Sequence, residues 1–326
     1  MNARQLENQE GLPSYRYDIP VMSRSRHLFG MLLAFACLLT MLPVYASSIL
    51  LINSADAPIY REVEDAFRAE AESLCAKNDE CPRIASILAR DLSDESARDH
   101  DLLVLIGQQA KDQANNLTID LPQLHLMVFR EEYDRQAPCC DRTSAIYIEQ
   151  PLERQLRFIR FLLPKLRRIA VLIGPGSFAG ESELLSLARG MGLEVELRRV
   201  ASQRDIGPVL HQLRNEVDIL LALPDPRVYN RDTVSNILLS TYRNRIPVIG
   251  FSKGLVHAGA LAAIHSSPGT IGTEAAGKAL QILRGMRPDS TYPEQAEFTL
   301  NRKVARSLHL QIPTDDALEA RWGKKR

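Results

Sequence analysis

The sequence predicts an α/β protein with two doubly wound lobes, each built on a parallel β-sheet. Short apolar runs recur between amphipathic helical segments, which is the pattern of βαβ units. The clearest example is the stretch 218–285, where strand, helix, strand, strand and helix are separated by turns rich in Gly, Pro, Ser and Asp. The alternation in 48–148 is repeated from 168 onward, so the second lobe is expected to repeat the architecture of the first.

The first predicted lobe opens with an apolar strand at 48–54. A helix is expected next, because Tyr60, Val63 and Phe67 recur at helical spacing and share one face. Three further apolar segments are predicted strands, at 83–89, 102–106 and 124–129. The highly charged stretch 130–142 is expected to be irregular, and the apolar segment 145–148 leads into another helix.

The second predicted lobe follows a helix that carries Leu152 and Leu156 on one face and ends at Pro164. The apolar run 217–223, bounded by turn residues, is typical of a strand buried on both faces. The same patterns predict strands at 168–173, 194–200, 246–249 and 298–300, and helices at 230–244 and 302–308. From Thr314 onward the chain is expected to be a polar tail.

The helix that closes the stretch 218–285 carries signals at both ends. Ser267 can cap the first amide groups, Pro268 fits the first helical position, and Gly285 stands where a left-handed terminating residue belongs. Gly272 and Gly277 keep one side of this helix small. We therefore expect it to lie close to the element that it covers.

The composition is that of a globular protein. Of 326 residues, 45% are hydrophobic and 25% are charged, and the length suffices for two domains. Forty basic residues balance forty acidic ones, so the formal net charge is zero. This balance argues against nucleic acid as the main partner.

The N-terminal region predicts export to the periplasm. Arg24 and Arg26 precede a continuous apolar run, 28–42, and the small-residue ending 44–46 fits a secretory signal cleaved after Ala46. An uncleaved membrane anchor is the alternative, because a bilayer span needs roughly 20 apolar residues. The cleavage-site pattern favours the signal peptide.

The residues that precede this signal are polar, which is unusual for an exported chain. The segment 22–26 has the composition of a natural start of a signal peptide. We therefore expect translation to begin at Met22 rather than at Met1.

Four cysteines follow the predicted cleavage site: Cys75, Cys81, Cys139 and Cys140. Oxidising conditions favour disulfides, and four cysteines allow three connectivities. Pairing of Cys75 with Cys81 closes the shortest comfortable loop, whereas Cys139 and Cys140 are adjacent and could pair with each other or with the first two. A metal site is the weaker interpretation, because no histidine lies at ligand spacing from either pair.

Parallel sheets bind small ligands at the carboxyl ends of their strands. In the second half of the chain those ends are 224–225, 250–252 and 265–267. Asp225 could contact a ligand amine or cap the helix that follows. Ser252 and His265 could likewise contact a ligand or make only structural hydrogen bonds.

The sequence carries no motif that predicts an enzyme. It lacks a nucleophile elbow, a phosphate-binding loop and a histidine-rich metal pattern, so neither catalysis nor a cofactor is expected. The turn Gly174-Pro175-Gly176 could present amides to an anion, but by itself this motif is weak evidence, and a tight turn is the alternative. A hydrolase that uses Ser252 and His265 is the weakest interpretation, since no triad motif supports it.

The segments RIPVIGFSKGLVHAGALAAI, GTIGTEAAGKALQILRG and FTLNRKVARSLHLQIP carry a family resemblance. The chain from 48 to 313 resembles the ABC-transporter substrate-binding proteins of the tryptophan/tyrosine-binding type, within the type I periplasmic binding proteins. The resemblance implies two Rossmann-like lobes that hold a ligand between them and close by hinge bending. It places crossovers near Ile148, Ile264 and Tyr292, with the helix after Ser267 returning to the first lobe.

These crossovers imply a division of the chain into four parts. The parts are an N-terminal extension with signal peptide (1–46), a first lobe (47–148 plus 265–291), a second lobe (149–264 plus 292–313) and a tail (314–326).

The resemblance also implies which residues face the ligand. They are Ser54, Ala55, Asp56, Gln108 and Gln109 from the first lobe, and Pro175, Gly176, Asp225 and Ser252 from the second. The strand-end rule adds His265 to these candidate ligand contacts. Family members commonly have an Asp-Pro pair after the fourth strand, whereas this chain has Arg130 and Glu131 there. The sequence thus leaves open whether the ligand is an amino acid, and Arg130 could instead favour an anionic group.

The sequence predicts an exported, monomeric solute-binding protein that captures an amino acid or a related small molecule. Its expected partner is the membrane permease of an ABC transporter. A ligand sensor or accessory protein on the same scaffold, acting on a membrane receptor or signalling partner, is the alternative.

Overall fold

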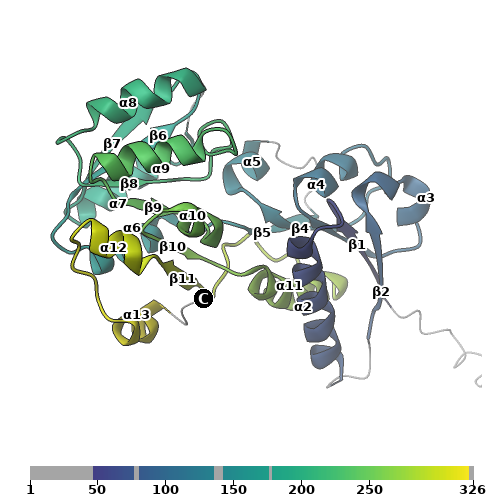
Figure 1. Cartoon of the computed structure of the whole chain (residues 1–326). Coiled ribbons are helices and arrows are strands. Elements are labelled where there is room, and N and C mark those ends of the chain that lie inside the picture. The colour runs from purple at the N-terminus through teal and green to yellow at the C-terminus, as the bar shows by residue number, and fades with distance from the viewer. Residues whose placement is uncertain (1–46, 77–80, 136–141, 176–177, 323–326) are drawn as a thin grey trace, which may run out of the picture. The chain divides into compact units, whose positions relative to one another are not determined.

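The computed structural model describes residues 47–76, 81–135, 142–175 and 178–322. The predicted signal peptide, the proposed start at Met22, Cys139, Cys140 and Gly176 lie outside these described residues. The described chain is an α/β protein with two sheets, and this confirms the predicted fold class (Figure 1).

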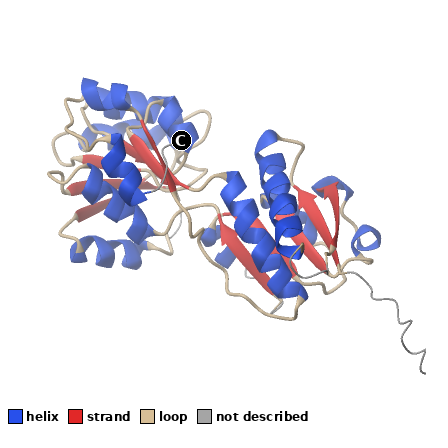
Figure 2. Cartoon of the chain, turned by 90° about the horizontal axis from the view of Figure 1, so that it is seen from below, coloured by secondary structure: helices blue, strands red, loops and turns tan. Residues whose placement is uncertain are grey.

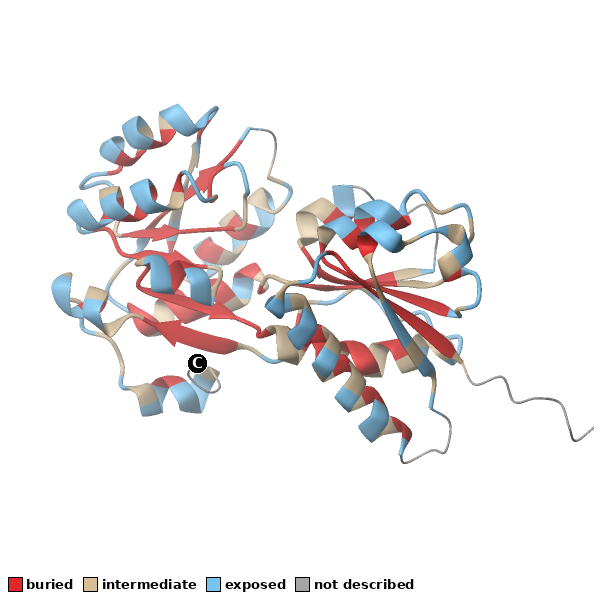
Figure 3. Ribbon diagram, turned by 45° about the vertical axis from the view of Figure 1, so that its right-hand side comes forward, coloured by how far each residue is buried: buried red, intermediate tan, exposed pale blue. Residues whose placement is uncertain are grey.

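The first sheet has five parallel strands in the order β2-β1-β3-β4-β5. Its strands are β1 (Ser48–Asn53), β2 (Arg83–Leu88), β3 (Leu102–Ile106), β4 (Gln123–Val128) and β5 (Thr143–Tyr147). The helices that accompany this sheet are α2 (Pro58–Cys75), η1 (Ala89–Asp91), α3 (Asp94–Ala97), α4 (Gln108–Ala114) and α5 (Arg130–Arg135). Strands β1 and β3 are buried along their whole length because helices cover both faces of the sheet (Figures 2 and 3).

Helix α5 corrects one expectation. The charged stretch after residue 129 begins as a regular helix rather than an irregular segment. Ion pairs four residues apart, Arg130 with Asp134 and Arg135 with Glu131, support this turn. Tyr133 supplies its buried side.

The second sheet has six strands in the order β11-β10-β9-β8-β6-β7. All neighbours are parallel except β10 and β11. Its strands are β6 (Arg168–Ile173), β7 (Glu194–Arg199), β8 (Ile219–Leu221), β9 (Val248–Gly250), β10 (Ala262–His265) and β11 (Glu297–Leu300). Its helices are α6 (Leu152–Leu162), α7 (Glu181–Gly190), η2 (Gln203–Asp205), α8 (Ile206–Gln212), α9 (Val234–Arg243), α10 (Lys253–Ala258), α12 (Arg302–Ser307) and α13 (Asp315–Trp322).

Helix α13 replaces the predicted polar tail. Leu318 is fully buried, and Trp322 packs edge-on against Phe158, with 5.6 Å between the ring centroids. Arg302 also pairs with Asp315 at the start of this helix. Two apolar side chains on one face and an ion pair at its start therefore attach this polar segment to the second lobe.

The chain passes between the two sheets three times. It leaves the first sheet after β5, returns after β10, and enters the second sheet again before β11. The helix between the last two passages is α11 (Pro268–Leu283). It packs on α2, and its Ile271, Ala275 and Ala279 join the core beneath the first sheet.

The predicted end signals of α11 are confirmed. Ser267 Oγ accepts a hydrogen bond from the Thr270 amide at 3.2 Å, and Pro268 is the first helical residue. Gly285 follows the last turn with φ of 81°, the left-handed conformation that glycine adopts without strain.

Gly272 is expected to be essential for the packing of α11 on α2. A Cβ atom at this position would overlap the carbonyl oxygen of Val63 and press on Ala66. Gly272→Ala is therefore expected to lower the free energy of unfolding by about 1–3 kcal/mol, because the two backbones must separate. Gly277 lies on the same helix with open space at its Cβ position.

Gly277→Ala is the matched control, and its better helix propensity predicts a gain of about 0.5–1 kcal/mol. Urea denaturation of both variants measures the difference. Equal stability of the two variants would show that the close approach of the helices does not constrain the fold.

Candidate functional site

Three cavities meet where strands of the two sheets end, and Phe129 and Pro224 line all of them. Phe129 follows β4 of the first sheet, and Pro224 follows β8 of the second. We call the three cavities together the cleft. Its position at the carboxyl ends of parallel strands is where open α/β sheets bind ligands.

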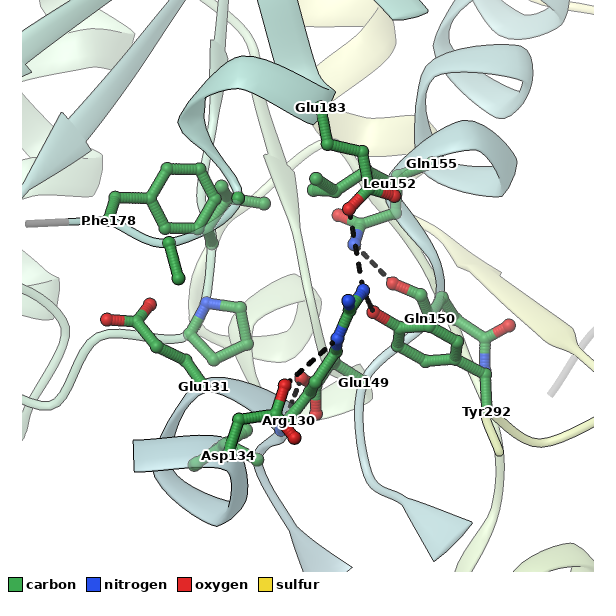
Figure 4. Close-up of a pocket in the computed structure, with 15 residues that line it drawn as sticks. Arg130, Glu131, Asp134, Glu149, Gln150, Leu152, Gln155, Phe178, Glu183 and Tyr292 are labelled. Carbon is green, nitrogen blue, oxygen red and sulfur yellow. Dashed lines mark hydrogen bonds and ion pairs between the residues drawn. The ribbon is translucent and has the colours of Figure 1, made fainter. Parts of the chain in front are cut away.

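The three cavities differ in their walls. The hinge cavity has a volume of about 110 Å³ and is lined by residues that include Arg130, Glu149, Gln155, Glu183 and Tyr292 (Figure 4). The Asp225 cavity has a volume of about 250 Å³ and is lined by residues that include Glu131, Arg135, Asp225 and Arg227. The His265 cavity has a volume of about 440 Å³ and is lined by residues that include Ile59, Glu149, Phe251, Ser252, His265 and Glu297.

A β-bulge places the first-lobe wall of the cleft. The register between β4 and β5 shifts at Met127, which has φ of 59°, a value that only a few per cent of residues other than glycine adopt. Met127 lines the His265 cavity, and Phe129 follows two residues later. The bulge thus redirects the end of β4 at the point where it borders the cleft.

Arg130 makes several contacts inside the hinge cavity. Its guanidinium donates to the Tyr292 hydroxyl at 3.0 Å and forms ion pairs with Asp134 at 3.3 Å and Glu183 at 3.4 Å (Figure 4). The hydrogen bond to Tyr292 is the largest of the effects that raise the pKa of Arg130 above its ordinary value. Arg130 is therefore charged, and its charge is compensated by protein carboxylates.

Glu149 has one satisfied and one unsatisfied carboxylate oxygen. Its Oε1 accepts a hydrogen bond from the Arg130 amide at 2.7 Å. Its Oε2 is buried and has no hydrogen-bond partner among the residues that the structure describes. Burial raises the pKa of Glu149 to about 7, against the opposing effect of the Arg130 amide.

Hydrogen bonds tie the three crossovers to one another beside Glu149. Gln150, in the first crossover, donates to Ser266 Oγ in the second at 2.8 Å. Arg154 donates both to Gln150 Oε1 at 2.6 Å and to the Pro293 carbonyl of the third crossover at 2.8 Å. The side-chain amide of Gln155 donates through Nε2 to the Gln150 carbonyl at 2.7 Å. The crossovers are therefore joined by a network of side chains and are not bare linkers.

The residues predicted at the strand ends of the first lobe lie apart from the cleft. Ser54, Ala55, Asp56 and Gln109 line a separate cavity of about 450 Å³ whose walls come from the first lobe alone. Ser54 Oγ accepts from the Ala110 amide at 3.0 Å, which fixes the start of α4. Gln108 donates to Asp112 at 2.8 Å within the same helix. The structure thus does not bring these residues together with Arg130.

Asp225 lines the cleft but does not cap the following helix, because α9 begins only at Val234. Its carboxylate accepts from the Gly174 amide at 2.9 Å and from the Arg227 amide at 2.9 Å. Burial opposes ionisation of Asp225, but the hydrogen bonds from Arg227 and Gly174 outweigh it and lower the pKa. The helix-cap interpretation is therefore wrong, and Asp225 cross-links two loops.

The predicted anion-binding turn is engaged by the protein itself. The Gly174 amide donates to Asp225, and the Pro175 carbonyl accepts from the guanidinium of Arg227. In the described part of this turn the amide of Gly174 is therefore already paired with a carboxylate.

Ser252 and His265 both line the His265 cavity, as the strand-end rule predicts. Ser252 Oγ accepts from the Leu255 amide at 3.3 Å and caps α10. His265 Nε2 lies 2.9 Å from Thr299 Oγ1, and burial is the main effect that lowers its pKa. These contacts are those of structural residues at the edge of a cavity.

Five residues that line the hinge cavity were not predicted as ligand contacts: Glu149, Gln155, Phe178, Glu183 and Tyr292. For Glu149 a signal was present, because it directly follows the apolar segment 145–148 and so stands at a strand end. For the others, which come from helices, a loop and the third crossover, no local pattern marks a ligand contact.

Cys75 is buried, Cys81 is exposed, and both are free thiols in the structure. Burial, followed by a hydrogen bond with Cys81, raises the pKa of Cys75 to about 11. The disulfide between them stays a prediction.

In the described residues no group of three or more His, Cys, Asp or Glu side chains is arranged to hold a metal ion.

Comparisons with known proteins agree with this architecture. The curated tyrosine-binding protein of Clostridioides difficile (strain R20291) is 22% identical over 257 residues, which cover 75% of this chain and 72% of the relative. The ABC domain of Streptococcus pneumonia in complex with L-Trp is 18% identical with a TM-score of 0.60, covering 86% of this chain and 99% of that one. The ligand-free, open structure of a Clostridium difficile substrate-binding protein with adhesive properties is 17% identical with a TM-score of 0.67, at the same coverage.

None of the helices in the described ranges is both long and apolar enough to cross a membrane.

The family model for ABC transporter substrate binding protein matches residues 144–321, which is more than half of the chain. This chain therefore belongs to the ABC transporter substrate-binding protein family.

Proposed function

We propose that this chain is an exported solute-binding protein that captures a small molecule in the cleft and delivers it to the permease of an ABC transporter. One observation carries the proposal: three cavities meet at Phe129 and Pro224, where strands of both sheets end beside the crossovers. The family is one of ligand-binding transport proteins rather than enzymes. The chain is accordingly proposed to bind its ligand without chemical change.

The crossovers supply the mechanism. A ligand that contacts both lobes binds the closed state more tightly than the open state and shifts the population toward closure. The Arg130–Glu183 ion pair already links α5 of the first lobe to α7 of the second. A closed surface that exists only with ligand present would be the surface that a permease recognises.

The proposed ligand class is an amino acid or a related small molecule. Support comes from two relatives, one named a tyrosine-binding protein and one with L-Trp bound. The apolar wall formed by Phe129, Phe178 and Leu223 suits an apolar side chain. The lining charges constrain the polar part of the ligand further.

Phe129→Ala is expected to weaken binding by about tenfold or more, because an aromatic wall shared by all three cavities is lost. A thermal-shift screen of residues 47–326 against amino acids, amines, carboxylates, purines and sugars first identifies a ligand by its stabilisation of the folded state. Tyr242→Ala is the matched control, because Tyr242 is an exposed aromatic residue on α9. Failure of every class to stabilise a folded sample would contradict the proposal.

Uptake of the labelled ligand by cells with and without the gene tests whether this protein delivers its ligand to a permease. Loss of uptake in the deletion strain, restored by the wild-type gene and not by Phe129→Ala, is the expected result. Binding in vitro with unchanged uptake would instead favour the sensor or accessory role.

A further inference from the structure

Two buried acceptor atoms line the hinge cavity without a donor. Among the described residues, neither Glu149 Oε2 nor Gln155 Oε1 has a hydrogen-bond partner. Gln155 is only 3% exposed. Because its Nε2 donates to the Gln150 carbonyl, the amide orientation is fixed and the oxygen is the atom left over.

Buried acceptors in proteins nearly always have partners. Two such oxygens in the lining of one cavity therefore indicate that donors are supplied from outside the chain. The residues come from adjacent parts of the chain, the first crossover and α6, and both are drawn with the hinge cavity in Figure 4. A ligand that fills this cavity is the natural source of the donor.

The charges around the cavity define the donor further. Arg130 shares the lining of the cavity with four carboxylates, Glu131, Asp134, Glu149 and Glu183, of which Glu131 is already paired with Arg135. The chain as a whole has no net charge, so this excess is local to the site. A cationic donor at Glu149 satisfies the Oε2 acceptor and offsets the negative charge.

Arg130 is poorly placed to receive an anionic ligand group. Its guanidinium is already hydrogen-bonded to Tyr292 and paired with Asp134 and Glu183. A ligand carboxylate would have to displace one of these partners while lying near Glu149. The contacts of Arg130 therefore argue against the anionic ligand that its sequence position suggested.

We propose that the cleft binds an organic cation, namely a primary amine with an apolar body and no carboxylate, whose ammonium group donates to Glu149 Oε2. The apolar body would contact Phe129 and Pro224 and extend into the His265 cavity, which also borders Glu149. This inference rests on the proposed solute-binding function and specifies its ligand class.

Matched ligand pairs test the inference by isothermal titration. Tyramine is the decarboxylated counterpart of tyrosine, for which one relative is named. Tryptamine is the decarboxylated counterpart of tryptophan, which is bound in one similar structure. Each amine is expected to bind at least about tenfold more tightly than its amino acid, because a buried carboxylate would face carboxylates. 3-Phenylpropionate, which has the carboxylate and no amine, is expected not to bind.

Glu149→Gln is expected to weaken amine binding by about 10- to 100-fold, since a charged hydrogen bond is lost. Glu153→Gln is the matched control: it makes the same change on an exposed residue of α6 that pairs with Arg157. Circular dichroism of both variants establishes that they are folded. Equal amine affinity of wild type and Glu149→Gln would overturn the assignment of Glu149.

The outcomes separate this inference from the solute-binding function. Tight binding of tyrosine or tryptophan without binding of the amines would overturn the inference and leave the function intact. Binding of only a sugar or a purine would do the same. Absence of any small-molecule ligand would overturn both.

Discussion

Replacing Glu149 by glutamine is expected to stabilise the ligand-free protein at pH 8 by about 1–3 kcal/mol. Burial raises the pKa of this carboxyl from its ordinary value of 4.5 to about 7. Each pKa unit corresponds to about 1.4 kcal/mol, so ionisation of Glu149 costs at most about 3 kcal/mol in the folded state. Glutamine keeps the shape and the acceptor for the Arg130 amide but removes the buried charge.

The pH dependence of this effect has a definite sign. Between pH 4.5 and about 7 the folded protein holds a proton on Glu149 that the unfolded chain has released. The contribution of Glu149 to stability therefore falls as the pH rises through this window. Below it the carboxyl is neutral in both states, so Glu149→Gln should then resemble the wild type.

Thermal melts of wild type and Glu149→Gln from pH 4 to pH 9 measure the effect, with Glu153→Gln as the control. The stabilisation is expected to appear above pH 5 and to level off above pH 7. A stability difference that does not change with pH, or a less stable variant at pH 8, would show that Glu149 is not the titrating group.

Binding of an amine should show the opposite dependence. The ammonium group requires the ionised carboxylate, so wild-type affinity is expected to rise as the pH passes through 7. The other charged groups near this carboxyl are Arg130 and Asp134, and Arg130 stays charged throughout this range. Glu149→Gln should therefore give a weak and nearly flat profile.

The sequence predicts the strands well because most of them are buried on both faces. The run 217–223 contains β8, and 102–106 coincides with β3, since continuous apolar residues between turn signals have few other stable arrangements. Helix α11 is predicted at both ends because Ser267 and Gly285 have local roles that need no tertiary information.

The site could be predicted only in part, because the order of strands in a sheet does not follow from local sequence patterns. The strand-end rule correctly brings Asp225, Ser252 and His265 to the cleft. In the first lobe it selected the ends of β1 and β3, whereas the cleft is lined by Phe129 and Glu149 after β4 and β5. The order β2-β1-β3-β4-β5 puts β5 at the edge of its sheet, directly before the first crossover.

The second large effect is expected at His125, in the core of the first lobe. His125 lies on β4, is 1% exposed, and neither ring nitrogen has a hydrogen-bond partner among the described residues. Burial, followed by the charge of Lys111, lowers its pKa to about 3. The folded protein thus holds a neutral histidine where the unfolded chain is protonated below its ordinary pKa of 6.5.

Stability is therefore expected to fall as the pH drops below 6.5, since the unfolded state then binds the additional proton. At pH 5 the loss amounts to about 2 kcal/mol relative to pH 8. His125→Phe removes the titrating group and retains an aromatic ring near Tyr133, whose ring centroid lies 5.3 Å from that of His125. The free energy of unfolding of the variant minus that of the wild type should therefore be about 2 kcal/mol larger at pH 5 than at pH 8.

Urea denaturation at the two pH values measures this difference of differences, which cancels the constant packing cost of the larger ring. His211→Gln, a change at an exposed histidine of α8, is the control and should leave the pH dependence unchanged. Equal pH dependence of wild type and His125→Phe would mean that His125 is protonated in the folded core. An imidazolium in the folded core would need a hydrogen-bond acceptor or an anion beside it. Among the described residues, the charged group that acts on His125 is the cation Lys111, which disfavours protonation.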